Sequence, residues 1–147
     1  MTAPGADLEG SWRLERWESV ADDGTVTYPF GERPDGVLVY APDGTMITTI
    51  APADRPRLGS MDPLRGGDDD ERRRAAETFV AYAGTWARSG DDVVHMVTVS
   101  LYPNWVGTRQ VRHVRLLDAG ARLELSTDPF VLDGRRTVQR LSWRRGP

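Results

Sequence analysis

Hydrophobic and polar residues alternate along much of this chain. Near its start, Trp12 and Leu14 alternate with Arg13 and Glu15. Successive side chains of a β-strand point to opposite faces, so this spacing predicts a half-buried strand. We expect Trp12 and Leu14 to face the interior of the protein.

The clearest hairpin lies between two short apolar runs, residues 36–40 and 45–50. They are joined by Pro-Asp-Gly at 42–44, and these residues favour a tight turn. Alternation along the two runs predicts that the inward side chains are Leu38, Tyr40, Met46 and Thr48.

Strand-like segments also fill the chain after Gly84. They span residues 85–88, 92–101, 108–117, 122–127 and 136–145. Turn signals separate them at intervals of about 8–12 residues, which is typical of a sandwich or barrel. We therefore predict an all-β fold, a closed antiparallel β-barrel of about 8–10 strands with one short helix. The chain would form a single domain, 1–147, with an ordered core over about 8–145.

One segment breaks this β pattern. Residues 51–69 are rich in proline and glycine and predict a long, lid-like loop. An acidic run followed by alanine-rich sequence then predicts a helix over about 70–83. Phe79 and Tyr82 fall on one side of this helix, so we expect it to lie against an apolar surface.

Composition excludes several kinds of chemistry. The chain has no cysteine and no lysine, so it has no thiolate nucleophile, disulfide or lysine Schiff base. Its net charge is −3, with arginines scattered among acidic residues, and this pattern does not favour nucleic-acid binding. The two histidines lack metal-ligand spacing. We expect no metal and no cofactor.

The sequence also bears on location and assembly. Its first residues have no basic or apolar signal region, and no apolar run approaches the roughly 20 residues of a membrane span. A cysteine-free chain suits a reducing cytoplasm. We expect a cytoplasmic protein without a membrane partner, either a monomer or a homodimer.

Polar residues in the segment 108–117 suggest a site inside the barrel. One face carries Gln110 and Arg112, while the other carries two arginines and a histidine that suit solvent. We expect Gln110 and Arg112 to face inward, where a guanidinium needs a partner. Two interpretations stay open: an ion pair with Glu18 or Glu15, or a site for a ligand carboxylate, enolate or ketone oxygen.

His95 lies in an apolar strand, and alternation places it inward with Val93 and Val97. It is either a hydrogen-bonded core residue or a general acid or base facing the lumen. A group of four aromatic residues and one asparagine is expected either to line the mouth of the barrel or to plug one end. Its members are Tyr82, Trp86, Tyr102, Asn104 and Trp105.

Several motifs occur in order along the chain. They are Leu8-x-Gly-Ser-Trp12, Asp43-Gly-x-Met46, Gly84-Thr-Trp86, Pro103-Asn-Trp-Val-Gly-Thr108, Gln110-x-Arg112 and Leu141-x-Trp143. From about residue 8 to residue 145, the sequence resembles the bacterial and fungal lipocalin-like domain family. The resemblance implies an antiparallel barrel with a central pocket. Members of this family are often encoded beside natural-product genes.

We therefore expect the barrel to bind a hydrophobic small molecule. The protein would act as a cofactor-independent cyclase or isomerase on polyketide- or terpenoid-like intermediates. The alternative is a non-catalytic carrier or sequestering protein for an apolar metabolite. The expected catalytic residues are Arg112 and Gln110, which would polarise a carbonyl, and His95 or Tyr40, which would move a proton. The expected ligand-binding residues are Trp12, Leu14, Leu38, Met46, Tyr82, Trp86, Asn104, Trp105, Leu125 and Trp143.

Overall fold

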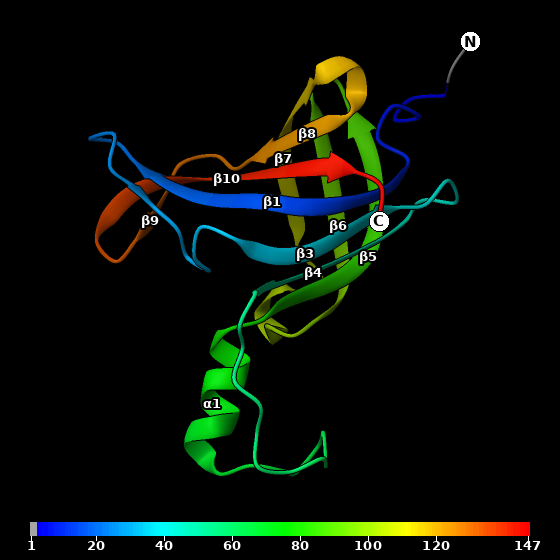
Figure 1. Cartoon of the computed structure of the whole chain (residues 1–147). Coiled ribbons are helices and arrows are strands. Elements are labelled where there is room, and N and C mark those ends of the chain that lie inside the picture. The colour runs from blue at the N-terminus through cyan, green and yellow to red at the C-terminus, as the bar shows by residue number, and fades with distance from the viewer. Residues whose placement is uncertain (1–2) are drawn as a thin grey trace.

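The computed structural model describes residues 3–147 and places ten strands of this range in one antiparallel sheet (Figure 1). The strand order is β2-β1-β3-β4-β5-β6-β7-β8-β10-β9, and β1 also pairs with β10. This additional pairing closes the sheet into a barrel of eight strands. The predicted all-β, closed antiparallel barrel with one helix is confirmed.

The barrel strands are β1 (Gly10–Ala21), β3 (Pro34–Tyr40), β4 (Thr45–Pro52), β5 (Val80–Ser89), β6 (Asp92–Ser100), β7 (Arg109–Leu117), β8 (Arg122–Ser126) and β10 (Arg135–Arg145). Two short strands extend the sheet, β2 (Val26–Thr27) beside β1 and β9 (Phe130–Leu132) beside β10. Single turns of 3₁₀ helix, η1 (Pro103–Trp105) and η2 (Asp118–Gly120), lie at either end of β7.

A β-bulge in β1 determines which of its side chains enter the barrel. Trp12 and Leu14 are buried, as predicted, but the pairing with β10 shifts register between Leu14 and Arg16. A bulge inserts one extra residue and so reverses the alternation beyond it. Trp17 consequently faces the interior, while Glu18 pairs with Arg140 of β10 on the outside.

One end of the barrel is closed by the residues that precede β1. Leu8 and Trp12 are fully buried there, and Nε1 of Trp12 donates to the carbonyl of Leu8 at 2.9 Å. Pairing of Gly10 with Tyr40 and of Trp12 with Arg145 places the ends of three strands around this plug. The opposite end, where β3 begins at Pro34 and β4 ends at Pro52, remains open.

The helix differs from its prediction in extent and position. α1 spans Asp69–Glu77 rather than 70–83, and its N-cap Asp68 accepts a hydrogen bond from the Glu71 backbone at 2.8 Å. It ends early because the β-branched and aromatic residues after Glu77 favour a strand, and Val80 pairs with Ile50 of β4.

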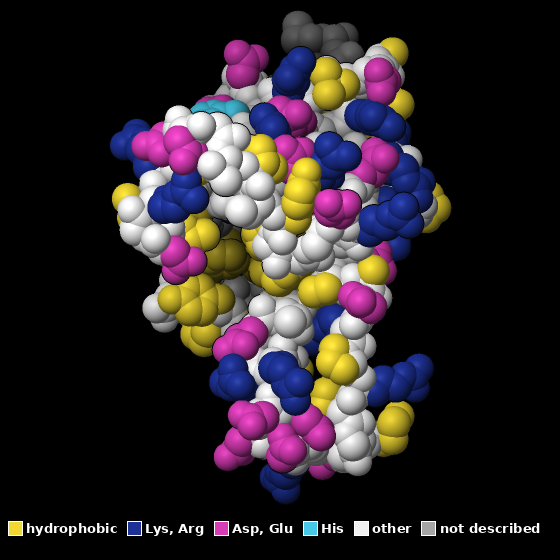
Figure 2. Space-filling view, turned by 60° about the vertical axis from the view of Figure 1, so that its left-hand side comes forward, with side chains coloured by type: hydrophobic (Ala, Val, Ile, Leu, Met, Phe, Trp, Pro, Cys, Tyr) yellow, Lys and Arg dark blue, Asp and Glu magenta, His cyan; other side chains and the backbone are white. Residues whose placement is uncertain are grey.

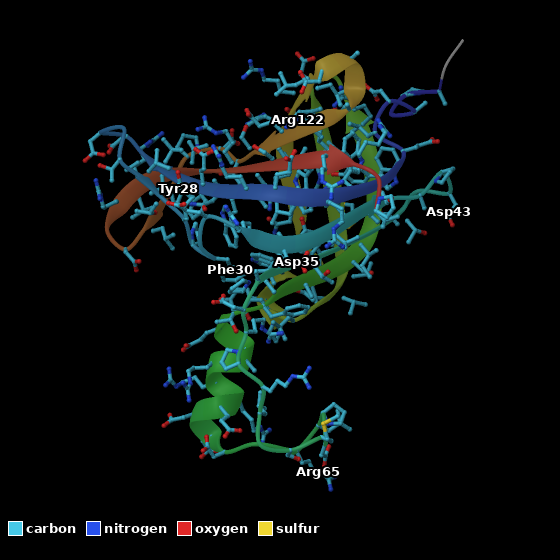
Figure 3. All side chains as sticks on the ribbon, viewed as in Figure 1. Tyr28, Phe30, Asp35, Asp43, Arg65 and Arg122 are labelled. Atoms are coloured by element: carbon cyan, nitrogen blue, oxygen red, sulfur yellow. The ribbon has the colours of Figure 1, made fainter. Side chains whose placement is uncertain are left out.

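No residue of α1 is buried, so the expected packing of this helix against an apolar surface was wrong. Residues 53–79 form an arm that extends from the open end of the barrel, and Arg65 lies at its far tip (Figures 1 and 3). Tyr82, which we placed on the helix, belongs to β5 and enters the barrel. No helix in residues 3–147 has both the length and the apolar character needed to cross a membrane.

Candidate functional site

The barrel contains a cavity of about 790 Å³ that opens at the end opposite the plug. Figure 2 shows a recess with hydrophobic side chains on this side of the molecule. Such a volume lies within the usual range of small-molecule sites, about 300–1,000 Å³. Its apolar wall includes Trp17, Leu38, Ile50, Leu125, Leu141 and Trp143.

At the wall of this cavity, the imidazole of His95 connects Tyr82, which lines the cavity, with Tyr40, which lies behind it. Nε2 of His95 lies 2.7 Å from the hydroxyl of Tyr40, and Nδ1 lies 2.8 Å from the hydroxyl of Tyr82. All three side chains are buried, from strands β3, β5 and β6. Alternation brings them together, because each points inward from its own strand.

The surroundings of this trio keep all three groups neutral. Burial, with a smaller effect from the Arg112 guanidinium, lowers the pKa of His95 to about 3. Burial likewise raises the pKa of Tyr40 well above its ordinary value, and it raises the pKa of Tyr82 against the opposing effect of Arg112. His95 is therefore an uncharged hydrogen-bonding group and a weak base at neutral pH.

Arg112 provides the positive charge of the cavity. Its Nη1 donates to the carbonyl of Val111 at 3.0 Å, and its Nη2 donates to Oε1 of Gln110 at 3.3 Å. Within residues 3–147 it forms no salt bridge, since Glu18 pairs with Arg140 and Glu15 pairs with Arg122. The interpretation of Arg112 as half of an ion pair with either glutamate was therefore wrong.

A second polar group lies on the wall formed by β1, β8 and β10. Nε2 of Gln139 donates to Oγ of Ser19 at 2.8 Å, and its Oε1 accepts from Nε1 of Trp17 at 2.7 Å. The backbone amide of Gln139 donates to Oγ1 of Thr127 at 3.1 Å. These bonds satisfy the Gln139 amide internally, which leaves Arg112 as the more available partner for a ligand.

Aromatic rings and a histidine bonded to two carboxylates lie around the mouth. The ring of Trp105, in η1, packs edge-on against Tyr82 at 5.6 Å and against Tyr102 at 5.8 Å. On another side of the rim, the imidazole of His113 lies 2.6 Å from Asp128 and 2.7 Å from Asp92. Hydrogen bonds to Asp128 and Asp92 raise the pKa of His113.

Eight of the expected site residues line the cavity: Arg112, Gln110, His95, Leu38, Tyr82, Trp105, Leu125 and Trp143. Trp12, Leu14, Tyr40 and Met46 are buried in the core behind it. Trp86 packs against Tyr40 at 4.7 Å and donates to the carbonyl of Ala41. It thus lies away from the mouth and apart from Trp105, with which we had grouped it. Asn104 is exposed and donates to the Tyr102 hydroxyl.

Sequence reasoning missed other lining residues. Trp17 was hidden by the bulge in β1, and Phe130 and Leu132 lie in β9, which we did not predict. Gln139 had a usable signal, since it lies two residues before Leu141 on the inward face of β10. Val111 also borders the cavity, although it lies on the face of the segment 108–117 that carries the two arginines and the histidine.

The described residues contain no cluster of three or more histidine, cysteine or acidic side chains placed to hold a metal ion. What the arrangement offers is hydrogen-bond donors in an apolar cavity. Arg112 and the Tyr82 hydroxyl lie on the same wall, and such donors can stabilise a ketone, enolate or carboxylate oxygen.

Two comparisons with known proteins agree with this geometry. The model of a family described as a lipocalin-like domain matches residues 9–146. A relative from Aspergillus oryzae, named 4'-hydroxy-3'-methoxypropiophenone carrier protein ppsC, is 38% identical over 90 residues. The aligned region covers 55% of this chain and 79% of that protein. The barrel, its cavity and the family match together show that this chain belongs to the lipocalin-like domain family.

Proposed function

We propose that this protein binds and carries an apolar small molecule whose carbonyl-type oxygen lies against Arg112. The observation that carries the proposal is a guanidinium that has no carboxylate partner within residues 3–147 and is held at the wall of a largely apolar cavity. An unpaired charge in such a place is costly, and a ligand oxygen would offset that cost.

The relative from Aspergillus oryzae supports the carrier interpretation and supplies a probe. Its name assigns it an aryl ketone, a molecule with an apolar ring and one carbonyl. The cavity here can accommodate both features, since Trp17, Leu141 and Trp143 provide apolar contacts for a ring and Arg112 provides a donor for a carbonyl. We propose aryl ketones or related oxygenated aromatic metabolites as the ligand class.

A titration with 4'-hydroxy-3'-methoxypropiophenone tests this proposal. Binding would be followed by the fluorescence of Trp17 and Trp143 in the cavity wall. We expect Arg112→Met to weaken binding by about tenfold or more, the usual effect of losing a charged hydrogen bond. Arg115→Met is the matched control, because Arg115 lies on the same strand with an exposed side chain and does not line the cavity. Equal affinity of the wild-type protein and Arg112→Met would contradict the proposal.

A cyclase or isomerase is the second candidate function. It is favoured by the presence of two donors, Arg112 and Tyr82, on one wall, because together they could stabilise an enolate. The low pKa of His95 weighs against that residue as the base. Its two ring nitrogens are also both hydrogen-bonded to tyrosines.

Deuterium exchange separates the two functions. In D₂O, an enolising enzyme would exchange the protons on the carbon next to the ketone of a bound probe, and Arg112→Met would stop that exchange. A carrier would return the probe unchanged, with only the uncatalysed exchange rate. We expect the second result.

A further inference from the structure

We infer that Tyr40, through His95, fixes the Tyr82 hydroxyl as a hydrogen-bond donor to the ligand, so that Tyr82 and Arg112 form a donor-only subsite. This subsite would select a ligand oxygen that only accepts, such as a ketone or enolate oxygen, over an alcohol. The ligand-selection part rests on the proposed function. The fixed direction of the hydrogen bonds does not.

The direction follows from counting protons, beginning at Tyr40. Its side chain is fully buried, and within residues 3–147 its hydroxyl has one hydrogen-bond partner, Nε2 of His95. If the Tyr40 oxygen accepted a proton from Nε2, its own hydroxyl proton would be buried without an acceptor. Leaving a buried donor unpaired costs about 1–3 kcal/mol. Tyr40 therefore donates to Nε2.

The second step fixes the tautomer of His95. A neutral imidazole carries one proton, and a nitrogen that accepts a hydrogen bond does not carry it. Because Nε2 accepts from Tyr40, the proton lies on Nδ1. Nδ1 then donates to the Tyr82 oxygen at 2.8 Å. The low pKa of His95 supports this neutral state.

The third step concerns the hydroxyl proton of Tyr82. Its oxygen accepts from His95, so its own hydroxyl hydrogen remains for another acceptor, and Tyr82 lines the cavity. Thr48 pairs with Tyr82 across β4 and β5, and its buried hydroxyl forms no hydrogen bond with the described part of the chain. A threonine hydroxyl can accept as well as donate, so the donor-only description applies to Tyr82 and Arg112 and not to Thr48.

Both ends of the Gln110 side-chain amide beside Arg112 are already engaged. Oε1 of Gln110 accepts from Arg112, while Nε2 of Gln110 donates to Oγ1 of Thr108 at 2.9 Å. The subsite thus presents a guanidinium and a phenol hydrogen. A ketone oxygen can accept from both, whereas an alcohol also brings a proton that needs an acceptor.

The tautomer can be measured without any ligand. In nitrogen-15 NMR spectra of His-labelled protein, the pattern of ring couplings identifies the nitrogen that carries the proton. His113→Asn removes the other histidine and assigns the signals. We expect His95 to carry its proton on Nδ1 at neutral pH. A proton on Nε2, or on both nitrogens, would overturn the inference whatever the ligand is.

Tyr40→Phe tests the positioning role of Tyr40. Tyr40 does not line the cavity, so a purely structural role would leave the His95 tautomer in place. We expect loss of the single Nδ1–H signal pattern and weaker binding of the ketone probe. Tyr102→Phe is the matched control, because this tyrosine is exposed at the mouth. An unchanged tautomer in Tyr40→Phe would contradict the inference.

A matched pair of probes tests selectivity: 4'-hydroxy-3'-methoxypropiophenone and the alcohol obtained by reducing its ketone. We expect the ketone to bind about tenfold more tightly, and Tyr82→Phe to remove most of that difference. Equal binding of the two by wild-type protein would overturn the donor-only subsite. If neither probe binds while the Nδ1–H tautomer is observed, the proposed ligand class fails and the fixed hydrogen-bond direction stands.

Discussion

The guanidinium carbon of Arg145 lies 4.2 Å from the centre of the Trp12 ring, at the closed end of the barrel. The same side chain donates to the carbonyls of Asp7, Glu9 and Gly120. It therefore ties the segment before β1 to the turn before β8 across the last strand. This plug leaves the opposite end as the entrance to the cavity.

Loss of Arg145 should weaken the plug and leave the cavity intact. Arg145→Ala removes a cation–π contact and three hydrogen bonds at a partly solvated site, so we expect a loss of about 1–2 kcal/mol in the free energy of unfolding. Urea denaturation measures it. Arg144→Ala is the control, because the adjacent Arg144 is exposed on the other face. Equal losses in both variants would contradict the assigned role.

Filling the cavity should abolish binding without unfolding the barrel. Leu141 lines the cavity, and about 790 Å³ of space can accept a larger ring there. We expect Leu141→Trp to weaken ligand binding by about tenfold or more, because the ring occupies the ligand's volume, while stability stays within about 1.5 kcal/mol. Titration and urea denaturation measure the two quantities.

The control for this prediction is the same substitution on the outer surface. Ile47 lies on β4 with 48% of its surface exposed, facing away from the cavity. Ile47→Trp should bind ligand like the wild-type protein. If Leu141→Trp binds equally well, the ligand site lies elsewhere.

Much of the fold could be predicted because the local signals agreed with one another. Alternation identified the inward residues of the hairpin, and Pro-Asp-Gly at 42–44 marked its turn. Gln110 and Arg112 were placed inside for the same reason, since the remaining face of β7 suits solvent. Periodicity succeeds wherever a strand is regular and has one buried face.

The failures share a different physical cause, namely long-range pairing. The bulge after Leu14 arises from how β1 pairs with β10, at the far end of the chain, and it moved Glu18 outside. The helix ended at Glu77 because β5 pairs with β4. The partnership of Tyr40 and Tyr82 with His95 likewise joins three strands, so spacing within any one strand could not reveal it.

Acid should destabilise the protein through His95. Its folded pKa of about 3 lies below the unfolded value of 6.5, so the unfolded state binds more protons between these values. The stability it contributes is complete above pH 6.5 and is lost as the pH falls towards 3. The linked change is roughly 4 kcal/mol over that range.

Comparison with His95→Gln isolates this effect from the titration of carboxyl groups. The glutamine amide does not titrate, so we expect this variant to show a flatter loss of unfolding free energy between pH 6.5 and about 3. Urea denaturation at a series of pH values supplies the curves. Parallel curves for the two proteins would show that His95 is not the buried neutral group described here.

The stability that His113 contributes at the rim of the cavity should change with pH in the direction opposite to that of His95. Hydrogen bonds from the His113 ring to the carboxylates of Asp128 and Asp92 raise the pKa of His113 above 6.5. The stabilisation from its charged form is complete below pH 6.5 and is lost as the pH rises through the raised value. The site is solvent-exposed, so we expect at most about 1 kcal/mol.

A rate measurement detects so small an effect better than an equilibrium one. Asp128 precedes Pro129 and Phe130, which line the mouth, so its bond to His113 holds that part of the rim. We expect ligand dissociation to accelerate as the pH rises through the His113 pKa, and Asp128→Asn to abolish that dependence. Asp133→Asn, an equal charge change in the turn after β9, should retain it. Loss of the pH dependence in both variants would instead assign it to the overall charge of this segment. Its persistence in Asp128→Asn would show that the bond between Asp128 and His113 does not control ligand dissociation.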